Sequence, residues 1–486
     1  MARYDLVLRG GTLLDGTGAA ATTGDVAIAE NRIAAIGKLA PGSGAAEIDV
    51  AGLAVAPGFI DVHTHDDRAL LSDPSMAPKA SQGVTTVIVG NCGVSLAPML
   101  PDMPLPPPLN LVGGDPRFRF RRFGAYLDAL DAAPAAVNSA ALIGHSTLRA
   151  GAMDRLDRPA SEREIAAMSE RLAEALDAGA IGLSSGLWYA PAHEAPKSEL
   201  VELAHELRKA GGIYTTHMRD EGDHVLDSLD ESFAVGSEAG IPVVISHHKV
   251  IGTNNFGRTV ETLPKIAAAI TRQPLGLDAY PYIASSTVLR AENIARALKI
   301  LITWSKPHPE ASGRELAEIA RGWGVGQEQA AERLQPAGAI YFMMSEEDVR
   351  RVLAFEHTMI GSDGLPHDRH PHPRLWGTFA RVLGHYCREE KLFPLEEAVR
   401  RMTGLPAERF GLAGRGLLAP GSYADLCVFD PDGIIDRASF AEPTTPAAGI
   451  HLVLVNGETV WREGSATGAR PGRALRRQQL QRERRG

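Results

Sequence analysis

The sequence is poor in cysteine and lacks long apolar runs. Its 486 residues include only three cysteines, Cys92, Cys387 and Cys427, and no Cys-x-x-Cys pair. A disulfide framework and a zinc ribbon are therefore not indicated. No apolar run approaches the ~20 residues that a membrane span needs, and the start, MARYDLVLRGG, is too polar for a signal peptide. These absences predict a cytoplasmic protein with no membrane partner.

Basic residues are fewer than acidic ones, 50 against 59. The formal net charge is −9, and the one basic cluster, RALRRQQLQRERRG, lies at the end of the sequence. Because no basic stripe runs through the body of the chain, we expect no nucleic-acid partner. Residues 471–486 are interpreted as a solvated or frayed basic tail. The hydrophobic content of 44% is ordinary for a globular protein, and the length allows more than one domain.

Short apolar runs alternate with helical stretches across residues 54–415. Eight runs rich in Val, Ile, Leu or Thr end on polar or small residues, at 53–65, 83–91, 139–146, 180–186, 212–218, 241–248, 275–282 and 358–364. One helical stretch, 161–179, opens with the capping-box pair Ser161 and Glu164. The alternation predicts an α/β fold, a (β/α)8 barrel of the TIM type, with its chemistry at the carboxyl ends of the strands. A doubly wound sheet is the alternative, but no GxGxxG follows a first strand.

The segments on either side of the predicted barrel have a different pattern. Residues 1–53 and 416–470 alternate apolar and polar positions between Gly-rich turns, which predicts β-strands without helices. We expect the two segments to form one small β-sandwich domain. Residues 285–356 exceed what a strand–helix unit needs after the seventh strand and contain helical patterns. An insertion there would overhang the barrel mouth as a lid.

Five of the eight apolar runs end on side chains that commonly bind metals. These are His63 and His65, Cys92, His217, His247 or His248, and Asp363. His63 and His65 are two apart, so both leave the same face of a strand. Strand ends meet at one mouth of a barrel, so we expect these side chains to gather there. The donor types suit Zn²⁺ or a similar metal, which favours Cys92 as a thiolate ligand over a small packing residue.

The chain resembles the amidohydrolase superfamily and, within it, the D-aminoacylases, over nearly its whole length. The HxH of PGFIDVHTHDD is typical of the superfamily, while GNCG, SHHK and GSDGLPHDRHPHPRLWG are typical of the subfamily. Many amidohydrolases bridge their metals with a carboxylated lysine after the fourth strand. Here that strand ends GLSSGLWY without a lysine, and in D-aminoacylases a cysteine after the second strand takes its place. The missing lysine therefore supports the resemblance to the D-aminoacylase subfamily.

The resemblance implies a Zn²⁺ cofactor with one tight site and a possible second, weaker site. Cys92, His217 and His247 would form the tight site, and His63, His65 and Asp363 the weaker one. The choice of His247 over His248 comes from the resemblance, because strand alternation alone leaves both open. Asp363 would also take the proton from the attacking water and return it to the leaving amine.

Four further residues acquire roles from the same resemblance. Lys249 and Tyr280 would polarise the scissile carbonyl and stabilise the oxyanion. Tyr189 and Arg374 would hold the substrate α-carboxylate, Arg374 as a bidentate partner. The alternatives are a half-buried packing role for Tyr189 and a surface ion pair for Arg374.

The implied reaction is hydrolysis of the amide bond of a small molecule, an N-acyl-D-amino acid, to a carboxylate and a free D-amino acid. Relatives that prefer acidic substrates carry a basic residue in the segment 288–295. That segment offers Arg290, but its register places the critical position nearer Asn293, which favours a broad or neutral preference. A deacylase specific for N-acyl-D-glutamate or D-aspartate is one alternative. A cyclic-amide hydrolase such as a hydantoinase is another, and it would need the missing lysine.

Overall fold

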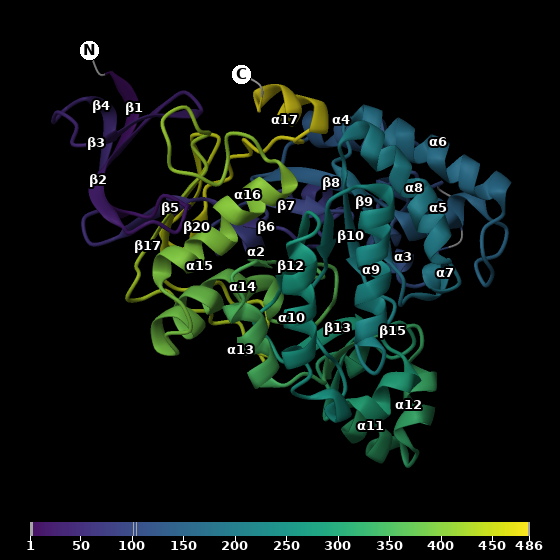
Figure 1. Cartoon of the computed structure of the whole chain (residues 1–486). Coiled ribbons are helices and arrows are strands. Elements are labelled where there is room, and N and C mark those ends of the chain that lie inside the picture. The colour runs from purple at the N-terminus through teal and green to yellow at the C-terminus, as the bar shows by residue number, and fades with distance from the viewer. Residues whose placement is uncertain (1–2, 101, 104, 485–486) are drawn as a thin grey trace.

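A barrel of eight parallel strands forms the centre of the computed structural model, which describes residues 3–100, 102–103 and 105–484 (Figure 1). The strands follow the order β16-β12-β11-β10-β9-β8-β7-β6. They are β6 (Phe59–Asp61), β7 (Val84–Val89), β8 (Asn138–Gly144), β9 (Gly182–Gly186), β10 (Ile213–His217), β11 (Val243–Ile245), β12 (Leu275–Ala279) and β16 (Thr358–Ile360). Each overlaps one of the predicted apolar runs, so the predicted barrel is confirmed.

Helices cover the outside of the barrel. The longer ones are α4 (Phe123–Ala132), α5 (His145–Ala152), α6 (Glu162–Ala178), α8 (Lys197–Ala210), α9 (Val225–Ala239), α10 (Thr259–Ile270), α13 (Glu346–Ala354), α14 (Arg374–Arg381) and α15 (Leu395–Met402). The predicted capping box starts α6, with Glu164 accepting from the Ser161 amide at 2.8 Å. Gly211 and Gly240, both with φ of 69°, end α8 and α9 in the left-handed conformation that glycine adopts freely. None of the described helices is long and apolar enough to cross a membrane.

The first and last strands close the barrel at their carboxyl ends. The Asp363 amide donates to the His63 carbonyl at 2.7 Å. Behind this contact the Lys79 ammonium is fully buried and donates to Asp61 Oδ2 at 2.7 Å and to the Ser362 hydroxyl at 2.8 Å. A buried charge must be paired to persist. The Lys79 contacts therefore hold the two strand ends, which carry candidate ligands, at a fixed separation.

Both ends of the chain contribute to a second sheet beside the barrel, which confirms the predicted small β domain (Figure 1). Its nine strands are β1 (Tyr4–Leu13), β2 (Thr22–Ala29), β3 (Arg32–Gly37), β4 (Gly44–Asp49), β5 (Ala54–Pro57), β17 (Leu426–Phe429), β18 (Ile450–Val455), β19 (Glu458–Arg462) and β20 (Ser465–Ala466). The strand β5 joins the halves, because it pairs with β1 on one side and with β17 on the other.

The insertion after the seventh barrel strand contains a sheet that the sequence pattern did not predict. The strands β13 (Ala284–Val288), β15 (Ala337–Phe342) and β14 (Lys299–Ser305) pair antiparallel in that order. The helices α11 (Leu316–Trp323) and α12 (Gln327–Leu334) complete this insertion, here called the lid after its predicted role; it lies at the opposite end of the view from α17 (Arg477–Glu483) (Figure 1). One of the helical patterns within residues 285–356 is α13, which packs beside β16 as part of the barrel.

The basic C-terminal segment packs against the barrel, so the expectation of a solvated tail is wrong up to residue 484; residues 485–486 lie outside the described residues. Leu475 and Leu480 are 3% and 4% exposed within an apolar cluster that includes residues from the barrel strands. Arg477 donates to the Leu176 carbonyl at 2.9 Å and to the Ala210 carbonyl, at the ends of α6 and α8. A guanidinium suits both carbonyls because helix carboxyl ends carry unpaired acceptors and partial negative charge.

Arg477→Ala should lower the free energy of unfolding by ~1.5–3 kcal/mol, because it removes charge-assisted hydrogen bonds to two helix ends. The thermal midpoint measures this loss. Arg482→Ala changes an exposed arginine of the same helix and should leave the midpoint unchanged. Equal midpoints for the two variants would contradict the docking of α17.

Candidate active site

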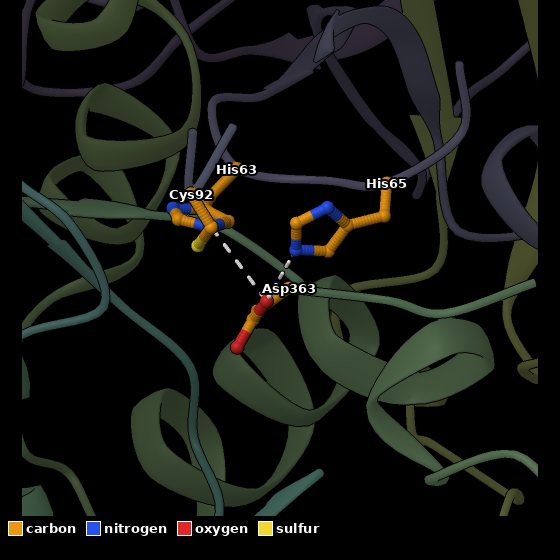
Figure 2. A group of neighbouring side chains, drawn as sticks. All are labelled: His63, His65, Cys92 and Asp363. Atoms are coloured by element: carbon orange, nitrogen blue, oxygen red, sulfur yellow. Dashed lines mark hydrogen bonds and ion pairs between the residues drawn. The ribbon is translucent and has the colours of Figure 1, made fainter. Parts of the chain in front are cut away.

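Six buried side chains converge at the carboxyl ends of the barrel strands. They form two groups that share Cys92: His63, His65, Cys92 and Asp363, and Cys92, His217 and His247. Within each group the possible ligand atoms lie within 4.8 Å of one another. Figure 2 shows the first group with its side chains pointing toward one another. The structure thus brings together all six residues that the sequence proposed as ligands.

The Cys92 sulfur lies at the centre of the cluster. It is 3.2 Å from His63 Nε2, 3.4 Å from His247 Nε2 and 3.7 Å from His217 Nδ1. Burial by itself would raise the pKa of the Cys92 thiol, but the imidazoles of His63, His247 and His217 outweigh burial and hold that pKa well below its usual range. The lowered pKa favours the thiolate, the form of cysteine that binds metals.

His247 and not His248 faces Cys92. The His248 ring points elsewhere, with Nε2 2.9 Å from the Thr262 hydroxyl, and burial lowers its pKa to about 4. Three of the clustered residues have left-handed backbone conformations, with φ of 52° at Cys92, 36° at His247 and 50° at Asp363. Such values are uncommon outside glycine. Strain of this kind collects at functional sites, where surrounding structure holds it in place.

Asp363 is held between imidazoles and a guanidinium. Its Oδ1 lies 3.2 Å from His65 Nε2 and 3.6 Å from His63 Nε2, and its Oδ2 lies 2.9 Å from Arg374 Nη1. Although burial raises the pKa of Asp363, Arg374 and the histidines lower it well below its usual range. Arg374 is fully buried, with Cζ 4.5 Å from the centre of the Tyr280 ring. Arg374 is thus not a surface ion pair, and in this structure it contacts Asp363.

Glu221, which the sequence analysis did not single out, contacts both histidines of the second group. Its carboxylate lies 3.1 Å from His247 Nδ1 and 3.7 Å from His217 Nε2, the ring nitrogens that face away from Cys92. The Lys249 ammonium donates to the same carboxylate at 2.7 Å. Metal-binding histidines commonly place their second nitrogen against a carboxylate, which fixes the ring orientation. The available sequence signal was an acidic residue four positions after His217, in THMRDEG.

Asp278, in DAYPY, also contacts two of the candidate ligands, His63 and His247. Its Oδ1 lies 3.4 Å from His63 Nδ1 and accepts from the His247 amide at 2.9 Å. The two carboxylates of Glu221 and Asp278 therefore lie against three of the imidazoles around Cys92. Neither carboxylate belongs to the two candidate ligand groups of the described residues.

A cleft of about 620 Å³, measured with its open mouth, leads to the cluster. The predicted residues Lys249, Tyr280 and Tyr189 line it, and the Tyr189 hydroxyl is 3.0 Å from Thr287 Oγ1. The hydroxyls of Ser285, Ser286 and Tyr280 are buried without a hydrogen-bond partner in the structure. Ser285 and Ser286 also line the cleft and were missed from the sequence; their position in PYIASST was the available signal.

Of the two residues predicted to recognise the side chain of the substrate, one lies at the cleft and the other does not. Asn293 is 1% exposed and lines the cleft. Arg290 is outside the cleft lining, pairs with Glu292 at 2.7 Å and places its guanidinium 4.5 Å from the centre of the Trp188 ring. The structure thus brings Asn293, and not Arg290, to the cleft surface.

A separate buried cluster resembles the surroundings of Glu221 but lies away from the ligands. Glu199 is 1% exposed and accepts from Arg149 at 2.6 Å, with His145 Nε2 at 2.9 Å. It therefore combines a carboxylate, an imidazole and a cation, as Glu221 does. None of these three residues lines the cleft or belongs to a candidate metal group of the described residues.

The fold and this donor set define a metal-dependent hydrolase. Comparison with known proteins shows its family. The model of the amidohydrolase family matches residues 46–255 and 211–461. The chain belongs to the amidohydrolase family.

Its similarity to the D-aminoacylases extends over the full length. The chain is 56% identical to D-aminoacylase and 50% identical to N-acyl-D-aspartate deacylase of Alcaligenes xylosoxydans xylosoxydans, covering 98% of this chain in both cases and 98% and 95% of those proteins. A crystal structure of D-aminoacylase superposes with a TM-score of 0.95 at 56% identity, over 97% of this chain and all of that one. N-acyl-D-glutamate deacylase from Bordetella bronchiseptica, solved with zinc and a phosphonate inhibitor, superposes with a TM-score of 0.94 at 47% identity, over 98% and 100%. The resemblance to the D-aminoacylases is thereby confirmed.

Glu221→Gln should weaken zinc binding about 10- to 100-fold, because an amide orients the two imidazoles less firmly than a carboxylate. Competition with a chromophoric chelator measures the zinc affinity. Glu199→Gln disrupts the similar cluster away from the ligands, so it should lower the thermal midpoint and leave zinc affinity unchanged. Wild-type zinc affinity in the Glu221 variant would contradict the orienting role.

Proposed function

We propose that this chain is a zinc-dependent N-acyl-D-amino-acid deacylase, which hydrolyses the amide bond of its substrate to a carboxylate and a free D-amino acid. The observation that carries the proposal is the Cys92 thiolate shared by two ligand groups at the base of a cleft with unpartnered hydroxyls. The similarity to enzymes that are themselves named D-aminoacylase and N-acyl-D-glutamate deacylase supports it. The partner is then a small-molecule substrate. The cytoplasmic location and the absence of a nucleic-acid partner stay predictions.

The donor set fits zinc. A thiolate, imidazole nitrogens and a carboxylate are its usual ligands. Cys92, His217 and His247 would form the tight site, and His63, His65 and Asp363 a second, weaker one. A zinc ion bound there supplies a Lewis acid that polarises an amide carbonyl and acidifies water. Because Cys92 belongs to both groups, occupancy of the second site would draw on a ligand of the first.

Asp363 would move the proton. The groups that lower its pKa keep Asp363 ionised at neutral pH, so it can accept a proton from the attacking water and pass it to the leaving amine. Its position between His65 and Arg374 would hold the carboxylate in one orientation throughout. Lys249 and Tyr280 would stabilise the charge that develops on the carbonyl oxygen, since both line the cleft.

The substrate α-carboxylate would bind at the polar side of the cleft. The hydroxyls of Ser285 and Ser286, together with Arg374 Nε, are buried donors without a partner. Buried donors of this kind are costly unless something accepts from them. A carboxylate would satisfy several at once, with Arg374 as its charged partner and Tyr189 close by.

A neutral side chain on the D-amino acid suits the cleft better than an acidic one. Arg290 pairs with Glu292 and lies over Trp188, whereas Asn293, which is uncharged, occupies the cleft surface. An N-acyl-D-glutamate or D-aspartate substrate, the alternative that two of the relatives' names suggest, would lack a free cation at this point. A cyclic-amide hydrolase is disfavoured because β9, GLSSG, has no lysine to carboxylate, and the likeness to D-hydantoinase, at 16% identity and a TM-score of 0.59, concerns the fold alone.

An amine-release assay of zinc-loaded protein tests the proposal. N-acetyl-D-leucine should be cleaved, N-acetyl-L-leucine should not, and N-acetyl-D-glutamate should be cleaved less efficiently than the D-leucine substrate. Preference for the D-glutamate substrate would reverse the assignment of side chain. Cleavage of hydantoin without cleavage of any N-acyl-D-amino acid would overturn the proposal.

Asp363→Asn should lower kcat by about 10²- to 10⁴-fold, because the amide cannot accept the proton from water. Zinc bound at the Cys92, His217 and His247 site should remain, since Asp363 is outside that group. Metal analysis and steady-state kinetics on the same preparation separate the two effects. Near-wild-type kcat with zinc retained would exclude Asp363 as the base.

A further inference from the structure

Cys92 lies in a turn with an unusual backbone conformation. Three of its four residues, 90–93, are left-handed, with φ of 80° at Gly90, 52° at Cys92 and 77° at Gly93. Glycine adopts such angles freely, whereas cysteine seldom does. This backbone places the Cys92 sulfur against three imidazoles. Other contacts must therefore hold the turn against relaxing.

The Ser184 hydroxyl bridges the two ends of this turn. It donates to the Gly90 carbonyl and accepts from the Gly93 amide at 3.0 Å. In an ordinary β-turn two such groups, three residues apart, commonly bond to each other. Here one hydroxyl from β9 is the partner of both. Because Ser184 bonds to both groups, it ties the two ends of the turn to a barrel strand.

The strand β9 also contacts the turn at a second point. The Cys92 carbonyl lies so close to Gly186 that a Cβ at this glycine would clash with it. Ser184 and Gly186 are two apart and so belong to the same face of the strand. From another side the Thr147 amide donates to the Gly93 carbonyl at 3.2 Å. The turn is thus packed onto one face of β9, and the Ser184 hydroxyl fixes it there.

The next residue, Ser185, has similar surroundings but different partners. Its hydroxyl lies 2.6 Å from the Tyr214 hydroxyl and donates to the Thr216 hydroxyl at 2.9 Å, and both partners belong to β10. Both serines are fully buried, and each has two hydrogen-bond partners. Ser185 therefore matches Ser184 in burial and bonding, but its bonds go to the neighbouring strand in place of the turn at 90–93.

We propose that Ser184 is a positioning residue for the metal site, which sets the zinc affinity by fixing the turn that carries the Cys92 sulfur. A serine hydroxyl is not among the usual ligands of zinc, so Ser184 acts through Cys92. Without the hydroxyl, the Gly90 carbonyl and the Gly93 amide lose a buried partner, which is costly. The turn would then relax to satisfy them and carry the sulfur with it. This inference rests on the proposed zinc site and adds a residue that controls it.

Zinc affinities of two matched variants test this role. Ser184→Ala should weaken zinc binding about 10- to 100-fold, as the loss of groups that orient a ligand does, whereas Ser185→Ala should stay within about twofold of the wild type. Competition with a chromophoric chelator measures the affinities, and thermal midpoints of the metal-free proteins compare the losses of stability. In the cobalt(II)-loaded proteins, the thiolate-to-cobalt band should shift or weaken per bound cobalt in Ser184→Ala and be unchanged in Ser185→Ala.

A second pair of variants separates the hydroxyl from packing. Threonine and valine have nearly the same shape, so Ser184→Thr and Ser184→Val crowd the strand equally and differ in the hydroxyl. The threonine variant should bind zinc about tenfold more tightly than the valine variant. This comparison does not depend on the stability of Ser184→Ala.

Three results would overturn the positioning role while the deacylase function stood. They are wild-type zinc affinity in Ser184→Ala, equal losses of affinity in Ser184→Ala and Ser185→Ala, and equal affinities in the threonine and valine variants. A wild-type protein that binds no zinc would overturn the role and the function together. Bound zinc without cleavage of any N-acyl-D-amino acid would overturn the function alone.

Discussion

The contact of one buried cysteine sulfur with three imidazoles is the interaction on which the arrangement of this site depends. The Cys92 sulfur lies 3.2–3.7 Å from nitrogens of His63, His217 and His247. Burying an anion is costly unless positive or polar groups surround it. The four residues come from four different strand ends, so the barrel must close to bring them together, and the left-handed backbone at Cys92 and His247 is part of how it does so. Carboxylate oxygens of Glu221 and Asp278 lie 3.1–3.7 Å from the other nitrogens of these rings.

Most of the fold could be predicted from the sequence because its signals are local. Each of the eight barrel strands lies in an apolar run, and the capping box at Ser161 starts the helix expected there. The lid sheet was missed because short apolar runs such as ILITWS and AGAIYF do not distinguish strands from buried helix segments. The docking of the tail was missed because a run of arginines is usually solvated, whereas Arg477 donates to carbonyls at helix ends that are 301 and 267 residues away.

The proposed ligands could be predicted from the sequence, whereas the residues that surround them could not. His63 and His65 share a strand face, and every proposed ligand follows an apolar run, so spacing and topology were sufficient. Glu221, Asp278, Ser285 and Ser286 follow no such rule, since their importance depends on which ring nitrogen or cleft surface they meet after folding. Sequence patterns carry no information about those orientations.

Spectroscopy of the cobalt(II)-substituted protein reports on thiolate ligation by Cys92. The account predicts a near-ultraviolet thiolate-to-cobalt charge-transfer band that saturates at one equivalent per chain. The band should be lost in Cys92→Ala and kept in Cys427→Ala, because burial without nearby imidazoles raises the pKa of the Cys427 thiol. A band of full intensity in Cys92→Ala, or none in the wild-type protein with cobalt bound, would contradict the account.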